Sequence, residues 1–174
     1  NYKSFNSRSL VEIARDKCLA SGIFDKVIIS SDDPFFEDLV NCKEVEFIKR
    51  TEQLADDNAT TDMVIDFFFE ELPSCESILW VNSVSPLQSI EDIKNCGASL
   101  HDPNVDCVMA INTLHQHCSM SNKPINFNPN SPFEKTQDLE PIQRYIYSCM
   151  GWKRETYIKS RMKGFKGLFP GNMS

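Results

Sequence analysis

Residues 22–33 of the chain read GIFDKVIISSDD, and this segment decides the fold. Gly22 is placed to end a helix, and the β-branched run Val27–Ile29 is typical of a short buried strand. Four polar residues, 30–33, follow the run directly. A helix, a buried strand and a polar turn in this order predict an α/β sheet whose ligands bind beyond the carboxyl ends of its strands.

The same alternation continues on both sides of this segment. Upstream, apolar residues from Leu10 to Leu19 recur at helical spacing, with Ser9 as the N-cap and Glu12 three residues later. Downstream, we expect helices at 34–40, 62–72 and 89–100, and strands at 45–48, 78–81 and 105–111. Short links favour crossover connections and therefore a three-layer α/β/α, Rossmann-like domain with a mostly parallel sheet.

The chain changes character after Asn112. Residues 113–144 are polar and contain four prolines, which interrupt any long element. A strand at 145–150 and a short helix at 154–159 are expected to follow. We therefore expect one domain over residues 1–174, with an inserted lobe or dimerisation segment at 113–150.

The overall composition excludes several classes of protein. A formal charge of −7 disfavours nucleic acid as a partner, since phosphates would be repelled. No apolar run approaches the roughly 18 residues that span a bilayer, so no membrane association is expected. The seven cysteines form no C-x-x-C pair, and with no visible signal peptide this favours a reduced, cytoplasmic protein.

Three more polar segments follow expected strands or lie in the lobe: RTEQLADDNATT at 50–61, NSVSPLQ at 82–88 and TQDL at 136–139. With residues 22–33, they resemble four motifs of the acylneuraminate cytidylyltransferases, or CMP-sialic acid synthetases, in order and interval. The opening Asn1 is also similar to the second residue of an early K-N pair of that family. The resemblance covers essentially the whole chain.

This resemblance implies a reaction. The anomeric hydroxyl of an acidic nine-carbon sugar, such as sialic acid or a related nonulosonic acid, attacks the α-phosphorus of CTP, and pyrophosphate leaves. Mg²⁺ is the cofactor that the family implies, and it would offset charge on the leaving group. Relatives are homodimers, so we expect a homodimer here, formed through residues 113–150.

The resemblance implies nucleotide contacts at Arg50, Thr61 and Asn1. Arg50 lies just past a strand, where its guanidinium could grip a base edge, ribose or phosphate; the alternative is a surface arginine paired with Glu52. Thr61 matches a ligand-contacting hydroxyl, and it could also cap the helix that follows.

Sugar contacts are implied at Asn82, Ser85, Gln88 and Gln137. Asn82 stands where the family has glutamine, and its amide could bind sugar hydroxyls or simply form a turn. Ser85 matches the family and is expected to shape that turn. Gln88 replaces the family's usual arginine, which removes a cation that could contact the sugar carboxylate.

Two clusters could hold a metal. Asp32 and Asp33 follow a strand, but such a pair more often caps the next helix, and we favour the cap. His115, His117 and Cys118 lie close together without a partner cluster, so we interpret them as solvated loop residues.

The resemblance also implies elements that this sequence does not contain. The family's phosphate-binding loop and first strand precede the position of Asn1, and its D-x-D metal segment follows the position of Ser174. We therefore expect the domain to be incomplete at both ends. The alternatives are a catalytically degenerate relative that acts in binding or assembly, or a different sugar nucleotidyltransferase.

Overall fold

The computed structural model describes residues 4–174 and divides the chain into two compact units. The first unit contains the chain up to Met109 together with Ser148–Ser174, and the second is Ala110–Tyr147. This second unit overlaps most of the segment 113–150 that the sequence sets apart. Asn1 lies outside the described residues.

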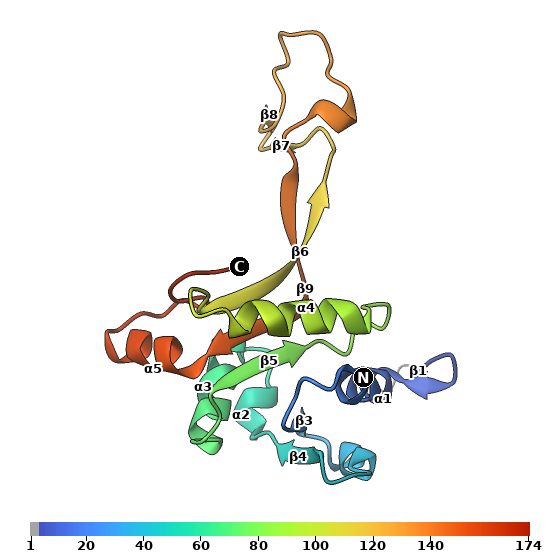
Figure 1. The fold of residues 1–174 in the computed structure, drawn as a ribbon, viewed down its shortest axis with the longest axis vertical. Helices are drawn as coiled ribbons and strands as arrows, with labels where there is room; N and C mark the ends of the chain where they lie inside the picture. Colours follow the sequence, from blue (N-terminus) through green and yellow to red (C-terminus); the bar gives the residue numbers. More distant parts are fainter. Residues whose placement is uncertain (1–3) are drawn as a thin grey trace. The chain divides into compact units, whose positions relative to one another are not determined.

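The helices and strands follow the expected order (Figure 1). The first unit contains β1 (Ser4–Phe5), β2 (Arg8–Ser9), α1 (Leu10–Ser21), β3 (Val27–Ser31), η1 (Pro34–Leu39), β4 (Val45–Lys49), α2 (Glu52–Ala55), α3 (Thr61–Glu71), β5 (Ser77–Val81), α4 (Ile90–His101) and α5 (Arg154–Met162). The second contains β7 (Ser119–Met120), β8 (Lys123–Pro124) and η2 (Thr136–Asp138). Two longer strands, β6 (Cys107–Leu114) and β9 (Ile142–Lys153), have residues in both units.

The local signals around α1 are confirmed. The Ser9 hydroxyl accepts from the Glu12 amide at 3.2 Å, and the Glu12 carboxylate accepts from the Ser9 amide at 2.8 Å. These hydrogen bonds to Ser9 lower the pKa of Glu12. Gly22 ends the helix in the left-handed conformation, at φ 66°, which costs glycine little.

The helix expected at 34–40 is instead the 3₁₀ helix η1. The Asp33 carboxylate caps it by accepting from the Phe35 amide at 2.9 Å, so the capping interpretation of Asp33 is confirmed. The segment is only six residues long, and Phe36 is its one buried side chain. A short segment that anchors a single aromatic side chain tolerates the tighter 3₁₀ turn.

The strands pair in two groups. β3 and β4 are parallel, and a separate three-stranded sheet has the order β5–β9–β6. β9 runs antiparallel to β5, so the described sheets are mixed rather than mostly parallel. The α/β fold class itself is confirmed.

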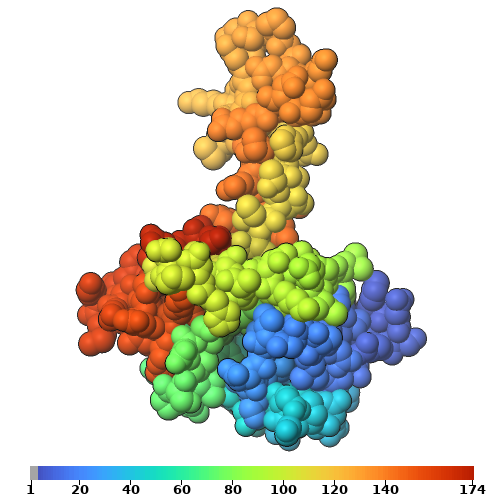
Figure 2. Space-filling view, in the orientation of Figure 1, coloured from blue at the N-terminus to red at the C-terminus, as the bar shows by residue number. Residues whose placement is uncertain are grey.

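Helices cover both faces of the three-stranded sheet. On one face, Ile65 and Phe69 of α3 and Tyr157 of α5 form a core with Met150 and Trp152 of β9. On the other face, α4 places Leu100 close to Gly151 of β9. α4 also contacts α1, and the two helices lie side by side in the space-filling view (Figure 2). This is the expected three-layer arrangement.

The second unit is organised by one buried amide. The Asn126 side chain donates to the carbonyls of Gln116 and Glu140, at 2.8 and 2.9 Å, and accepts from the Cys118 amide at 2.9 Å. His117 is not a solvated loop residue, because its ring stacks on Phe133 with a centroid separation of 3.8 Å.

Within residues 4–174, no helix has the length and apolarity needed to cross a bilayer.

We predict that Gly151→Ala destabilises the first unit. A Cβ at this position would lie 2.9 Å from side-chain atoms of Leu79, Leu100 and Val108, so three neighbours would have to move at once. Overpacking of this kind lowers the free energy of unfolding by about 1–3 kcal/mol, which urea denaturation can measure. The control is Lys94→Ala on the exposed side of α4, expected to stay within about 0.5 kcal/mol. Equal stabilities of the two variants would contradict the packing described.

Candidate functional site

The carboxyl ends of three strands meet in the first unit. β3 and β4 pair in register from Val27 with Val45 to Ser31 with Lys49, and the Arg50 amide then donates to the Ser31 carbonyl at 2.9 Å. Ser31, Arg50 and Asn82 all line one cavity of about 1060 Å³, to which the end of β5 contributes Asn82. We call these three residues the strand-end site.

Arg50 provides the cationic side chain of this site. No ion pair among residues 4–174 joins it to Glu52, the partner that a purely surface role would need. Its Nε is buried and has no hydrogen-bond partner in that part of the chain. A buried guanidinium N–H without a partner is costly, so this group is suited to receive an acceptor from a ligand.

Asn82 begins a tight turn at the end of β5. Its backbone amide donates to the Ser148 carbonyl at 2.9 Å, and its side-chain oxygen accepts from the Val84 amide at 3.2 Å. The turn interpretation of Asn82 is therefore confirmed. Its side-chain NH₂ remains as the group that could donate to a ligand.

A lysine from α1 holds the rest of this turn. The Lys17 ammonium donates to the Pro86 and Gln88 carbonyls at 2.5 and 2.6 Å. Ser85 makes backbone hydrogen bonds with Asn82 and Gln88, as expected of a residue that shapes the turn. From the sequence alone, Lys17 has no individual role, because its partners are about 70 residues away.

The other expected contact residues lie in different places. Asp32 lines the cavity, whereas Thr61, Ser85 and Gln88 do not. Both polar atoms of the Gln88 side chain are buried, and the side chain lies against the thiol of Cys149. Gln137 lies in η2 of the second unit, which is described by itself, so its contact with a sugar stays a prediction.

The described residues do not build a metal centre. Asp32 is exposed at the end of β3, and its carboxylate accepts only a long hydrogen bond, 3.4 Å, from the Ser31 hydroxyl. Within residues 4–174, no group of three or more His, Cys, Asp or Glu side chains could hold an ion. A single carboxylate supplies too few ligands to hold a metal ion by itself.

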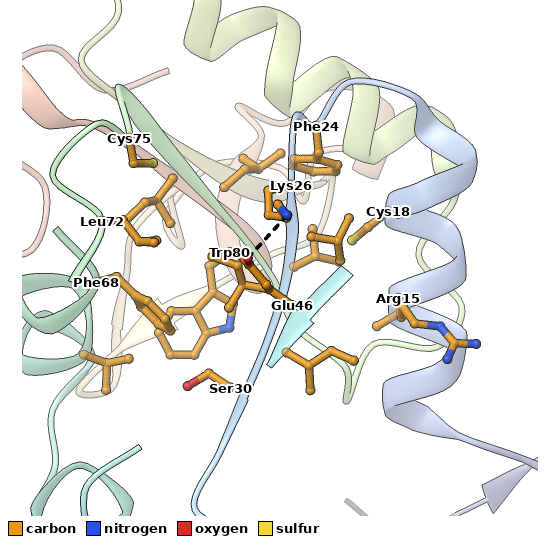
Figure 3. A pocket seen from close by; sticks show the side chains of 18 of the residues that line it. Arg15, Cys18, Phe24, Lys26, Ser30, Glu46, Phe68, Leu72, Cys75 and Trp80 are labelled. Atoms are coloured by element: carbon orange, nitrogen blue, oxygen red, sulfur yellow. Dashed lines mark ion pairs between the residues drawn. The ribbon is translucent and has the colours of Figure 1, made fainter. Parts of the chain in front are cut away.

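Sequence reasoning placed Ser30 in the polar segment 30–33 without giving it a role of its own, and it did not predict the character of the cavity wall. The Ser30 hydroxyl is buried, lines the cavity and has no partner among the described residues. The sequence feature that could have identified Ser30 is a hydroxyl side chain directly after the apolar run of β3. Figure 3 shows Phe68, Leu72 and Trp80 on one side of the cavity and Cys18 of α1 on another. The wall therefore has an apolar stretch away from the strand ends, and charged side chains line it elsewhere, among them Lys26 and Glu46, which form an ion pair at 3.4 Å.

Solved structures with a similar fold are nucleotidyltransferases. The crystal structure of 4-diphosphocytidyl-2C-methyl-D-erythritol synthase from Anaerococcus prevotii aligns with a TM-score of 0.64 at 13% identity, covering 98% of this chain and 78% of that one. A CMP:2-keto-3-deoxy-manno-octonic acid synthetase complexed with CTP aligns with a TM-score of 0.64 at 12% identity, covering 95% and 71%. At such identities the likeness establishes the fold alone.

A family match gives more than the fold. No curated protein matches the sequence. The cytidylyltransferase family, in contrast, matches residues 1–148, which is most of the chain and includes all three residues of the strand-end site. The chain therefore belongs to the cytidylyltransferase family.

Proposed function

We propose that this protein transfers the cytidylyl group of CTP to an acidic nine-carbon sugar and releases pyrophosphate. The oxygen of the sugar's anomeric hydroxyl forms a bond to the α-phosphorus, and the bond from that phosphorus to the pyrophosphate oxygen breaks. The hydroxyl proton leaves to solvent or a base. CTP as the donor is supported by the family match and by the CTP complex of the neighbouring synthetase.

The observation that carries the proposal is the common cavity of Ser31, Arg50 and Asn82. A triphosphate is strongly anionic, and the buried Nε of Arg50, which has no partner among residues 4–174, is a charged donor suited to one of its oxygens. The Asn82 NH₂ offers a neutral donor across the same cavity, which suits a sugar hydroxyl. Thr61, Ser85, Gln88 and Gln137 remain proposed contacts that come from the family resemblance, and Asn1 lies outside the described residues.

The acidic sugar is supported by the four motifs in the sequence and, more loosely, by a neighbour that acts on another sugar acid, named in its title as 2-keto-3-deoxy-manno-octonic acid. Asn82, which lines the cavity and stands in place of the family's glutamine, favours a nonulosonic acid that differs from the usual family substrate. Mg²⁺ is a proposed cofactor that would arrive with the triphosphate, because Mg²⁺ commonly binds through substrate phosphates with few protein ligands.

The test is a pyrophosphate-release assay on the natural polypeptide at its full encoded length, with Mg²⁺ present. CTP, UTP, ATP and GTP are each offered with N-acetylneuraminic, legionaminic or pseudaminic acid. We expect release with CTP and one of the acids. Binding of CTP without release would indicate a non-catalytic relative, and release with another nucleotide would indicate a different nucleotidyltransferase.

Arg50→Ala is expected to lower kcat/KM for CTP at least tenfold, about 1.4 kcal/mol of transition-state stabilisation, because a cation in the cavity is lost. Lys43→Ala removes an equal charge from a side chain that is 91% exposed, and it should leave the kinetics unchanged. A folded Arg50→Ala protein with unchanged kinetics would remove Arg50 from the site.

The proposed homodimer is supported by the surface of the second unit. Seven large apolar side chains of this unit are exposed: Ile111, Met120, Ile125, Phe133, Tyr145, Ile146 and Tyr147. Met120 is 70% and Phe133 78% exposed. Apolar surface of this extent in so short a segment is typical of an interaction site, and we propose that a second copy covers it.

We predict that Met120→Glu raises the dimer dissociation constant at least tenfold, because it places a charge in the apolar interface. Asn130→Glu adds the same charge at another exposed position of the same unit and should have little effect. Sedimentation equilibrium at micromolar concentrations measures both variants. A wild-type protein that is monomeric at these concentrations would exclude the dimer.

A further inference from the structure

α4 and β9 face each other on one side of the three-stranded sheet. Met150 and Trp152 of β9 belong to the core that α3 and α5 cover. Because side chains alternate between the two faces of a strand, Cys149 and Gly151 point toward the other face. Leu100 of α4 lies over Gly151 there, since a Cβ on Gly151 would be 2.9 Å from the Leu100 side chain. This contact fixes where the helix crosses the strand.

The same contact identifies the residue of α4 that lies over Cys149. α4 follows β5 and packs back along the sheet, and β9 is antiparallel to β5, so α4 and β9 run in the same direction. Cys96 precedes Leu100 by about one helical turn, roughly 6 Å along the axis. Cys149 precedes Gly151 by one strand repeat, roughly 6.6 Å along the strand. The two steps match, so the side chains of Cys96 and Cys149 meet.

The two thiols are reduced and in hydrogen-bond contact. Cys149 is fully buried, and the hydrogen bond to Cys96 together with burial raises the pKa of its thiol, so this thiol stays protonated. The same hydrogen bond lowers the pKa of Cys96, whose side chain is partly exposed. Because the thiolate is the nucleophilic form of cysteine, Cys96 is the more reactive of the two.

The cysteine pair is tied to the turn that carries Asn82 at both ends of that turn. At its start, the Asn82 amide donates to the carbonyl of Ser148, the residue before Cys149. At its end, the buried side chain of Gln88 lies against the Cys149 thiol. The next residue, Ser89, is the N-cap of α4, so the turn leads directly into the helix that carries Cys96.

We propose that Cys96 and Cys149 form an oxidation site, in which hydrogen peroxide joins the two sulfurs in a disulfide and thereby displaces the turn 82–88. A disulfide holds its sulfurs about 2.05 Å apart, which is shorter than any hydrogen-bond contact between thiols. The bond therefore draws α4 and β9 together at this point and moves the Cys149 sulfur relative to Gln88. Disulfides of reducing compartments are typically transient and serve redox sensing, which agrees with the reduced pair seen here.

The oxidation proceeds in two steps. The Cys96 thiolate attacks one oxygen of hydrogen peroxide; an S–O bond forms, the O–O bond breaks, and the leaving hydroxide takes up a proton to give water. The Cys149 sulfur then attacks the sulfur of the Cys96 sulfenic acid; the S–S bond forms and the S–O bond breaks. The second hydroxide leaves with the Cys149 thiol proton as water. Two thiols are oxidised by two electrons, and one peroxide is reduced to two waters.

Mass spectrometry of the natural polypeptide at its full encoded length, treated with hydrogen peroxide and then digested, tests this proposal. We expect the peptide that contains Cys149 to be linked to Cys96, with the loss of two hydrogen atoms, and dithiothreitol to restore both thiols. Cys96→Ser should abolish the link. The matched control, Cys118→Ser, removes another partly exposed cysteine and should keep it. A Cys149 that stays reduced, or that pairs with a different cysteine, would overturn the proposal.

The displacement of the turn is measured separately by backbone amide NMR. Oxidation is expected to shift the amides of Asn82 and Val84 in the wild-type and Cys118→Ser proteins, but not in Cys96→Ser, and to leave α5 unmoved. Unmoved turn amides after complete cross-linking would refute the coupling between the cysteine pair and the strand-end site.

Only the effect on turnover rests on the proposed function. In an active protein, cross-linking is expected to slow pyrophosphate release at least about fivefold, with recovery in dithiothreitol and no loss in Cys96→Ser. Unchanged turnover after complete cross-linking would contradict the inference and leave the proposed function standing. A protein that releases no pyrophosphate with any substrate pair would refute the proposed function, and the cross-link and the amide shifts would still decide the oxidation site.

Discussion

The hydrogen bond from the Arg50 amide to the Ser31 carbonyl, 2.9 Å long, closes the parallel ladder of β3 and β4 at its carboxyl end. It fixes a cationic side chain beside a strand end that already carries hydroxyl groups. Because β5 ends at the same cavity, the turn that starts at Asn82 faces the same space. The proposed chemistry depends on this convergence, which is a property of parallel strands rather than of any single residue.

The first half of the fold could be predicted because its signals are local. The capping box at Ser9, the left-handed Gly22 and the apolar run of β3 each act within a few residues. β9 was only partly predicted, since six of its twelve residues, 142–144 and 151–153, lie outside the apolar stretch read as a strand. Its length and antiparallel direction depend on pairing with β5, about 70 residues away, which no local pattern encodes.

The residues of the site also divide into those that could be predicted from the sequence and those that could not. Arg50 and Asn82 were identified from the family resemblance together with their positions directly after strands, and the structure brings both to one cavity. The roles of Lys17, which holds the turn, and of His117, which stacks on Phe133, were missed because their partners are distant in sequence. Gln88 was expected to face a sugar, but its amide is buried outside the cavity lining.

The most direct measurement of the central claim is a CTP titration of the isotopically labelled natural polypeptide, followed by backbone amide NMR shifts. The account predicts that the largest shifts fall on Ser31, Arg50 and Asn82, with α5 unaffected. Saturable shifts confined to α5 or the second unit, with these three amides unmoved, would contradict it.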